Sequence, residues 1–130
     1  MNRGERKSLF RFRQSPVYQA AREFRSKTRG LAKRLPDSER YLLKDQMSRA
    51  VDSICLNKAE GSNKLSDRNF SRYLNNSETS LEEVVGCLDL SLDDGHITER
   101  EFEEYHREAE ALGRQLIAFG KKVRDEGSYL

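Results

Sequence analysis

Apolar residues recur at steps of three and four along four segments of this chain, and the positions between them are mostly charged or polar. This spacing is typical of helices that bury one face against their neighbours. It predicts helices at about residues 16–35, 37–60, 66–91 and 98–124. The strict alternation of a half-buried strand does not extend over any useful length of the sequence. The pattern therefore predicts an all-α protein.

Residues with known positional preferences mark the ends of these segments. Ser15 precedes Pro16, and serine favours the cap of a helix while proline favours its first position. Gly61 follows the second segment, where glycine commonly ends a helix. Thr98 and Glu101 have the spacing of a capping box, in which each side chain binds the other residue's backbone N–H. Because short connections make consecutive helices antiparallel, we expect an antiparallel up-and-down four-helix bundle.

The chain divides into three parts on this basis. Residues 15–125 form the predicted bundle, and residues 126–130 form a short tail. Residues 1–14 are basic and polar apart from three large apolar side chains. We expect this stretch to be a short, flexible basic arm whose aromatic rings can dock on a neighbouring subunit.

Composition narrows the class of protein further. The chain of 130 residues suffices for one hydrophobic core, and hydrophobic and charged residues each make up 35% of it. It contains neither an apolar run long enough to span a membrane nor the apolar segment of a signal peptide, so we expect a cytoplasmic protein. Its two cysteines, Cys55 and Cys87, fall within the helical pattern and are expected to be reduced.

Positive charge is concentrated at the beginning of the chain. The formal net charge is +2, but residues 1–34 contain eleven basic and two acidic side chains, and the rest contains 13 basic and 20 acidic ones. Such an asymmetry favours either a surface that faces nucleic acid or one half of a self-complementary assembly. The candidate phosphate-binding residues are Arg11, Arg13, Arg22, Arg25, Lys27, Arg29, Lys33 and Arg34. Alternatively, this basic surface meets the acidic fourth helix of a neighbouring subunit, and the protein is a structural scaffold.

Residues 90–101 resemble a calcium-binding loop in their glycine and final glutamate. Leu90 and Leu92 occupy the positions that must supply carboxylate oxygens, so we expect a tight Asp94-Gly95 turn into a capped helix instead. Histidines and cysteines lack the spacing of metal ligands, and sequence motifs of nucleophiles, phosphate loops or dinucleotide sites are missing. The sequence therefore predicts neither an enzyme nor a bound metal or cofactor.

A row of polar residues follows one side of the second predicted helix, beside its apolar stripe. At about 100° per residue its members fall within a narrow sector, which indicates a hydrogen-bonded seam between helices or between subunits. An ordinary solvated face is the alternative. Within this row Arg49 and Glu60 are a candidate charge pair. The row consists of Gln46, Arg49, Ser53, Asn57 and Glu60.

The same segment carries a family resemblance. Residues 39–61, ERYLLKDQMSRAVDSICLNKAEG, resemble the pattern E-x-Y-x-L-x-x-Q-x-R-R-A-x-x-S-I-x-x-N-I-A-E-G of the four helix bundle proteins, also called ribosomal-RNA intervening-sequence proteins. Shorter stretches at 17–20, 70–74 and 79–83 also match the family. The departures are Tyr18 for Trp, Thr79 for Gly, and Lys58 for Ile, which puts a charge at an apolar position.

The resemblance implies a small bacterial protein that assembles as a ring-like homopentamer. Relatives in fold, the accessory variability proteins of diversity-generating retroelements, bind a reverse transcriptase and nucleic acid. Our hypothesis is a non-enzymatic oligomeric bundle that binds structured RNA through its basic first helix and arm. The alternatives are an accessory subunit of a retroelement, which binds a reverse transcriptase and its RNA, and a scaffold that binds only protein.

Overall fold

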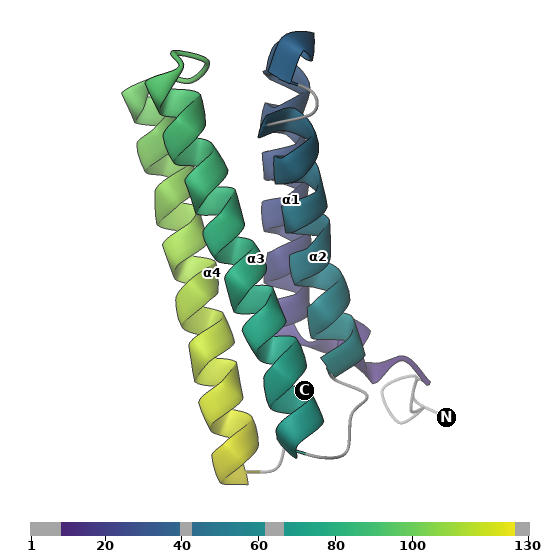
Figure 1. Ribbon diagram of the computed structural model, residues 1–130. Helices are drawn as coiled ribbons and strands as arrows, with labels where there is room; N and C mark the ends of the chain where they lie inside the picture. Colours follow the sequence, from purple (N-terminus) through teal and green to yellow (C-terminus); the bar gives the residue numbers. More distant parts are fainter. Residues whose placement is uncertain (1–8, 40–42, 62–66, 127–130) are drawn as a thin grey trace, which may run out of the picture.

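Six helical elements make up the computed structural model, which describes residues 9–39, 43–61 and 67–126 (Figure 1). No strand occurs within these ranges. None of the helices in them is long and apolar enough to cross a lipid bilayer. The four long helices are α1 (Pro16–Arg34), α2 (Asp45–Gly61), α3 (Asp67–Asp93) and α4 (Glu99–Glu126), and the two short 3-10 helices are η2 (Arg11–Gln14) and η3 (Asp37–Glu39).

The four long helices form an antiparallel up-and-down bundle. Each successive helix reverses direction, as Figure 1 shows by the colour gradient along the chain. Helix α1 packs against α2 and α4, and α3 packs against the same two helices from the other side. Both the all-α class and the bundle topology predicted from the sequence are thereby confirmed.

The bundle is held together by one apolar stripe from each helix. The largest fully buried apolar side chains include Leu31, Met47, Ile54, Leu88 and Leu116, so every long helix contributes. Burial of a side chain of this size stabilises the fold by about 1.5–3 kcal/mol. The steps of three and four in the sequence correctly identify these positions.

Local signals fix the ends of the helices. The Ser15 hydroxyl accepts a hydrogen bond from the Tyr18 N–H at 3.5 Å. In the capping box, the Glu101 N–H donates to Thr98 Oγ1 at 3.1 Å and the Thr98 N–H donates to Glu101 Oε1 at 3.0 Å. This reciprocal pair confirms the predicted start of α4.

A turn at a glycine ends helix α3. Gly95 has a φ of +77°, a conformation that glycine adopts without strain. Its N–H donates to the Leu92 carbonyl at 3.0 Å, and the His96 N–H donates to the Ser91 carbonyl at 2.9 Å. These two bonds are those of a Schellman motif, so the Asp94-Gly95 turn expected from the sequence is observed.

Two segments differ from their expected form. Residues 11–14, expected in a flexible arm, form η2 instead, because the Phe12 ring packs edge-on against the Tyr18 ring at 5.0 Å. The Phe12 ring therefore packs within its own chain, whereas Phe10 is exposed. Helix α2 begins at Asp45 rather than at residue 37, where η3 forms a separate short turn. Ser66, the first residue of the third predicted helix, lies outside the described residues.

Candidate nucleic-acid interface

Helix α1 carries the predicted basic row, and the structure divides it into paired and unpaired cations. Arg25 Nε lies 2.6 Å from Asp52 Oδ1, and Arg29 Nη1 lies 2.8 Å from Asp52 Oδ2. One carboxylate on α2 thus binds two guanidinium groups that are one turn apart on α1. These two ion pairs partly neutralise the positive charge of Arg25 and Arg29. The spacing of basic residues in the sequence did not reveal them.

Two further basic residues of α1 bind acidic residues of α4. Lys27 pairs with Glu108, and Arg34 pairs with Glu101. The Glu108 carboxylate raises the pKa of Lys27, and the hydrogen bond from Arg34 lowers the pKa of Glu101. The basic helix therefore meets the acidic fourth helix of its own chain, a contact that the scaffold alternative assigned to a neighbour.

Four of the eight candidate cations are exposed and are not paired with an acidic residue of the described ranges. Arg11 and Arg13 lie on η2, and Arg22 and Lys33 lie on α1. None of the four makes an ion pair with the residues that the structure describes. Arg22 and Lys33 are eleven residues apart, which places them about 20° apart around α1, and η2 packs against α1 and α2. These four cations are the part of the basic surface that is available to phosphate groups.

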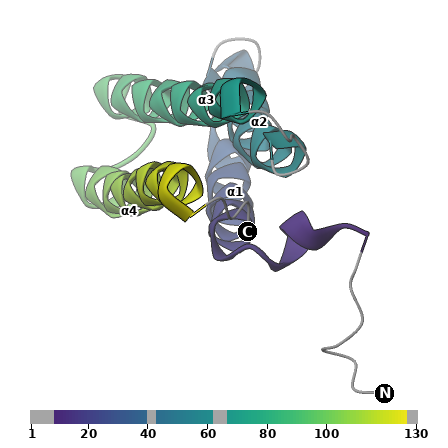
Figure 2. The ribbon, with the colours of Figure 1, turned by 90° about the horizontal axis from the view of Figure 1, so that it is seen from below.

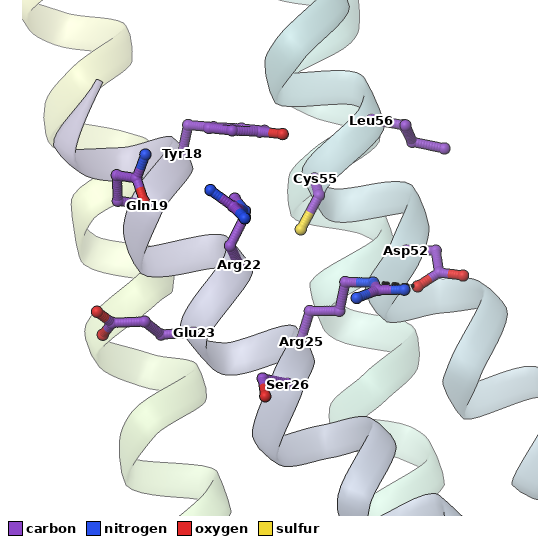
Figure 3. Close-up of a pocket in the computed structure, with 9 residues that line it drawn as sticks. All are labelled: Tyr18, Gln19, Arg22, Glu23, Arg25, Ser26, Asp52, Cys55 and Leu56. Atoms are coloured by element: carbon purple, nitrogen blue, oxygen red, sulfur yellow. Dashed lines mark hydrogen bonds and ion pairs between the residues drawn. The ribbon is translucent and has the colours of Figure 1, made fainter. Parts of the chain in front are cut away.

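An open groove of about 660 Å³ separates α1 from α2 on this side (Figure 3). Arg22 and Arg25 project into it from α1, and the Asp52 carboxylate and the Cys55 thiol lie across from them on α2. The Arg22 guanidinium lies 5.9 Å from the centre of the Tyr18 ring, within the range of a cation–π contact. The groove thus presents an aromatic ring and a cation side by side.

The Cys55 thiol in this groove has low reactivity. Burial raises the pKa of Cys55 to about 11, so the side chain is protonated at neutral pH and is a poor nucleophile. Both cysteines are free thiols in the structure, as the sequence predicted. Within the described residues, no group of three or more histidine, cysteine or acidic side chains is arranged to hold a metal ion.

The middle of the polar row on α2 packs against α3. Ser53 Oγ accepts a hydrogen bond from Ser80 Oγ of α3 and another from Asn57 Nδ2, each at 2.9 Å. Asn76 Nδ2 donates to Asn57 Oδ1 at 3.4 Å. Ser53 and Asn57 therefore belong to a polar seam between α2 and α3. Their α3 partners were not singled out in the sequence, since small polar residues on a helix have no distinctive spacing.

Arg49, a charged member of the row, lies outside this seam. The Arg49 side chain is 73% exposed and pairs with Asp45 one turn away at 3.1 Å. Such an exposed pair contributes at most about 0.5 kcal/mol, far less than a semi-buried pair with Glu60 would. Gln46 is exposed, and the Glu60 side chain lies outside the described residues.

Lys58 is buried in the core near the end of α2. Only 2% of the residue is exposed, and its Nζ lies 4.2 Å from the centre of the Phe119 ring of α4. Burial lowers the pKa of Lys58 to about 8, because removing an ammonium group from water disfavours the charged form.

The sequence pattern described as "23S rRNA-intervening sequence protein" matches residues 13–118, which is most of the chain. The chain belongs to this family. The match takes in all of α1, α2 and α3, the Arg13 end of η2 and most of α4. The family resemblance seen in the α2 motif is therefore confirmed.

A crystal structure supports the fold of this 23S rRNA-intervening sequence family member. It is that of a protein with unknown function from the S23 ribosomal protein family of Bacteroides thetaiotaomicron, with a TM-score of 0.74 and 24% sequence identity. The similarity covers 81% of this chain and 98% of that chain. Among curated proteins, no significant match is found.

Two departures from the family pattern acquire a structural meaning. Tyr18, where the pattern has Trp, is the residue against which both Phe12 and Arg22 lie. Lys58, where the pattern has Ile, keeps the buried position of the apolar residue and places its ammonium group against an aromatic ring. Both positions retain a packing role while gaining a polar group.

Proposed function

We propose that this protein is a non-enzymatic, cytoplasmic assembly of several copies that binds structured RNA through η2 and the adjoining side of α1. The observation that supports the proposal is the set of four exposed cations on that side, Arg11, Arg13, Arg22 and Lys33. The description of the family, which refers to 23S rRNA, favours RNA over DNA as the ligand.

Binding in this proposal rests on neutralising phosphate groups. Arg22 and Lys33 are eleven residues apart, about 16 Å along α1 at 1.5 Å per residue. They can therefore contact two separated phosphates of one folded RNA at once. Each contact releases condensed counterions, so the affinity falls as the salt concentration rises. For each phosphate contacted, the logarithm of the affinity falls by about 0.7–0.9 for every tenfold rise in salt concentration.

The test is Arg22→Glu combined with Lys33→Glu, measured by fluorescence anisotropy with a labelled RNA hairpin across a salt series. We expect the affinity to fall at least about tenfold at low salt and the slope against log salt to become shallower by about 1–2. Lys121→Glu with Lys122→Glu is the matched control, because it makes the same change of charge at exposed positions on α4. If the Arg22 and Lys33 variant binds as tightly as the parent, the RNA site is elsewhere.

Asp52→Asn tests the same surface in the opposite direction. Removal of this carboxylate releases Arg25 and Arg29 from their ion pairs, so two further cations become available to phosphates. We expect tighter RNA binding and a slope that is steeper by up to about 1–2. An unchanged affinity would show that these two arginines do not reach the RNA.

The number of copies in the assembly can be measured independently of RNA binding. Light scattering of the purified protein at micromolar concentration and physiological salt should give a mass several times that of one chain of 15.1 kDa, and we expect five copies. A mass of one chain would contradict the assembly without bearing on RNA binding. If the Arg22 and Lys33 variant separates into single chains, the basic residues join subunits and the protein is a scaffold.

A further inference from the structure

A second groove lies between α2 and α3 and differs in character from the basic one. It has a volume of about 610 Å³ and is lined by the apolar side chains of Leu43, Cys87 and Leu90. Leu90 is 53% exposed, an unusual state for a large apolar residue beside a hollow. Gly86 lines the middle of this groove, and a Cβ atom added there would meet no other heavy atom within 4 Å.

The rim of the α2–α3 groove is acidic. Glu83, Asp89 and Asp94 line it, and the exposed Asp93 is the last residue of α3. The carbonyl end of α3 adds a partial negative charge at the same place. None of these four carboxylates makes an ion pair with a residue that the structure describes. The groove therefore suits a ligand with apolar side chains next to positive charges.

The segment just before α1 has this composition. Leu9 is 89% exposed, Phe10 follows it and is more than half exposed, and the exposed Arg11 and Arg13 come directly afterwards. The Phe12 ring packs against the Tyr18 ring, and this contact fixes η2, with its two arginines, against α1. Apolar groups and cations are thus adjacent in this segment in the way that the groove requires.

The two surfaces lie at opposite ends of the bundle, so one chain cannot join them. Figure 1 shows η2 beside the end where α1 begins, whereas the groove lies at the end where α2 begins and α3 ends. The length of α1, about 28 Å at 1.5 Å per residue, separates these ends. Figure 2 shows that η2 also extends away from α3 and α4.

We propose that residues 9–13 of one copy dock into the α2–α3 groove of a second copy. Leu9 and Phe10 cover Leu90 and the hollow at Gly86, and Arg11 and Arg13 lie against the acidic rim. Because the two surfaces differ, the contact is heterologous, and its repetition closes a ring or extends a filament. This inference rests on the proposed assembly and names the surfaces that form it. Arg11 and Arg13 then lie in the contact between copies, and Arg22 and Lys33 are the exposed cations that remain for RNA.

The first test fills the groove. Gly86→Leu places a side chain in open space and replaces a glycine inside a helix with a better helix former, so the variant remains folded. We expect light scattering to show single chains of 15.1 kDa where the parent is assembled. Gly30→Leu is the matched control, since a Cβ at that position in α1 also meets nothing within 4 Å. An unchanged mass for Gly86→Leu, with the parent assembled, overturns this inference alone.

The second test exchanges the charges. Arg11→Glu with Arg13→Glu should dissociate the assembly, and so should Glu83→Lys with Asp89→Lys, because each places like charges in contact. A chain that carries all four substitutions should assemble again, since every arm then finds a groove of opposite charge. The control is Glu82→Lys with Glu110→Lys, at the groove between α3 and α4. Dissociation by the control pair, together with no recovery in the chain that carries all four substitutions, would place the contact at the α3–α4 groove instead.

Discussion

Individual residues set the stability of this bundle where polar groups enter its core. The buried face of α1 contains Thr28, which is fully buried and whose hydroxyl has no hydrogen-bond partner among the described residues. A buried hydroxyl without a partner is costly, because it loses its bond to water and gains none in return.

Thr28→Val should therefore stabilise the protein, since valine has the same shape without the hydroxyl. We expect the free energy of unfolding in urea to rise by about 1 kcal/mol. Thr28→Ser is the control, because it keeps the hydroxyl and removes the methyl group, and it should lower the same quantity by about 1 kcal/mol. A loss of stability in the valine variant would mean that the hydroxyl has a partner after all.

The Lys58 ammonium group gives the stability an unusual dependence on pH. The pKa of Lys58 is about 8 in the folded state and about 10.4 in the unfolded chain. Below pH 8 both states carry the proton, and the cost of burying the charge is present in full. Between about pH 8 and 10.4 the unfolded chain binds more protons, so the contribution of Lys58 to stability becomes more favourable as the pH rises.

Lys58→Met removes this cost while keeping the length of the side chain. We expect the variant to be more stable than the parent by about 1–3 kcal/mol at pH 7, after allowing for the lost cation–π contact with Phe119. The difference should shrink towards pH 10, measured by urea denaturation. Lys33→Met, at an exposed position, should leave a constant difference. Parallel profiles for Lys58→Met and the parent would contradict the lowered pKa.

At the scale of the helices, the ends are fixed by short-range signals that act within one turn. The capping box at the start of α4 satisfies two N–H groups that the helix itself cannot bind. Thr98→Ala should lower the free energy of unfolding by about 1 kcal/mol, as other lost caps do. Thr79→Ala is the control, since Thr79 is exposed in the middle of α3. Equal effects of the two substitutions on thermal unfolding would show that the Thr98 cap does not stabilise the fold.

The elements show clearly what the sequence could predict. Apolar spacing and capping residues act locally, so the four helices, the Schellman turn and the capping box were all predictable. The starts of α2 and η2 were not, because they depend on contacts such as that between Phe12 and Tyr18. Pairing between helices was also hidden, since nothing in the spacing of Arg25, Arg29 and Asp52 shows that the three side chains meet.

At the scale of the whole molecule, the concentration of positive charge near the beginning of the chain has two structural consequences. Half of the candidate cations join α1 to α2 and α4, and half make no ion pair with the described residues. The net charge of a segment therefore overstates what is available to a ligand. The candidate site was predicted as a segment, whereas its division required the positions of Asp52, Glu101 and Glu108.

The burial of Lys58 also makes it a reporter of motion in the bundle. Once the helices open and water reaches the amine, Lys58 regains the pKa of an ordinary lysine and reacts with an acylating reagent as the surface lysines do. Its position among the helices prevents contact with the reagent. Acylation of this one lysine therefore has to wait until α2 and α4 separate, and mass spectrometry of a labelled sample would convert its delay relative to the surface lysines into the free energy of that opening.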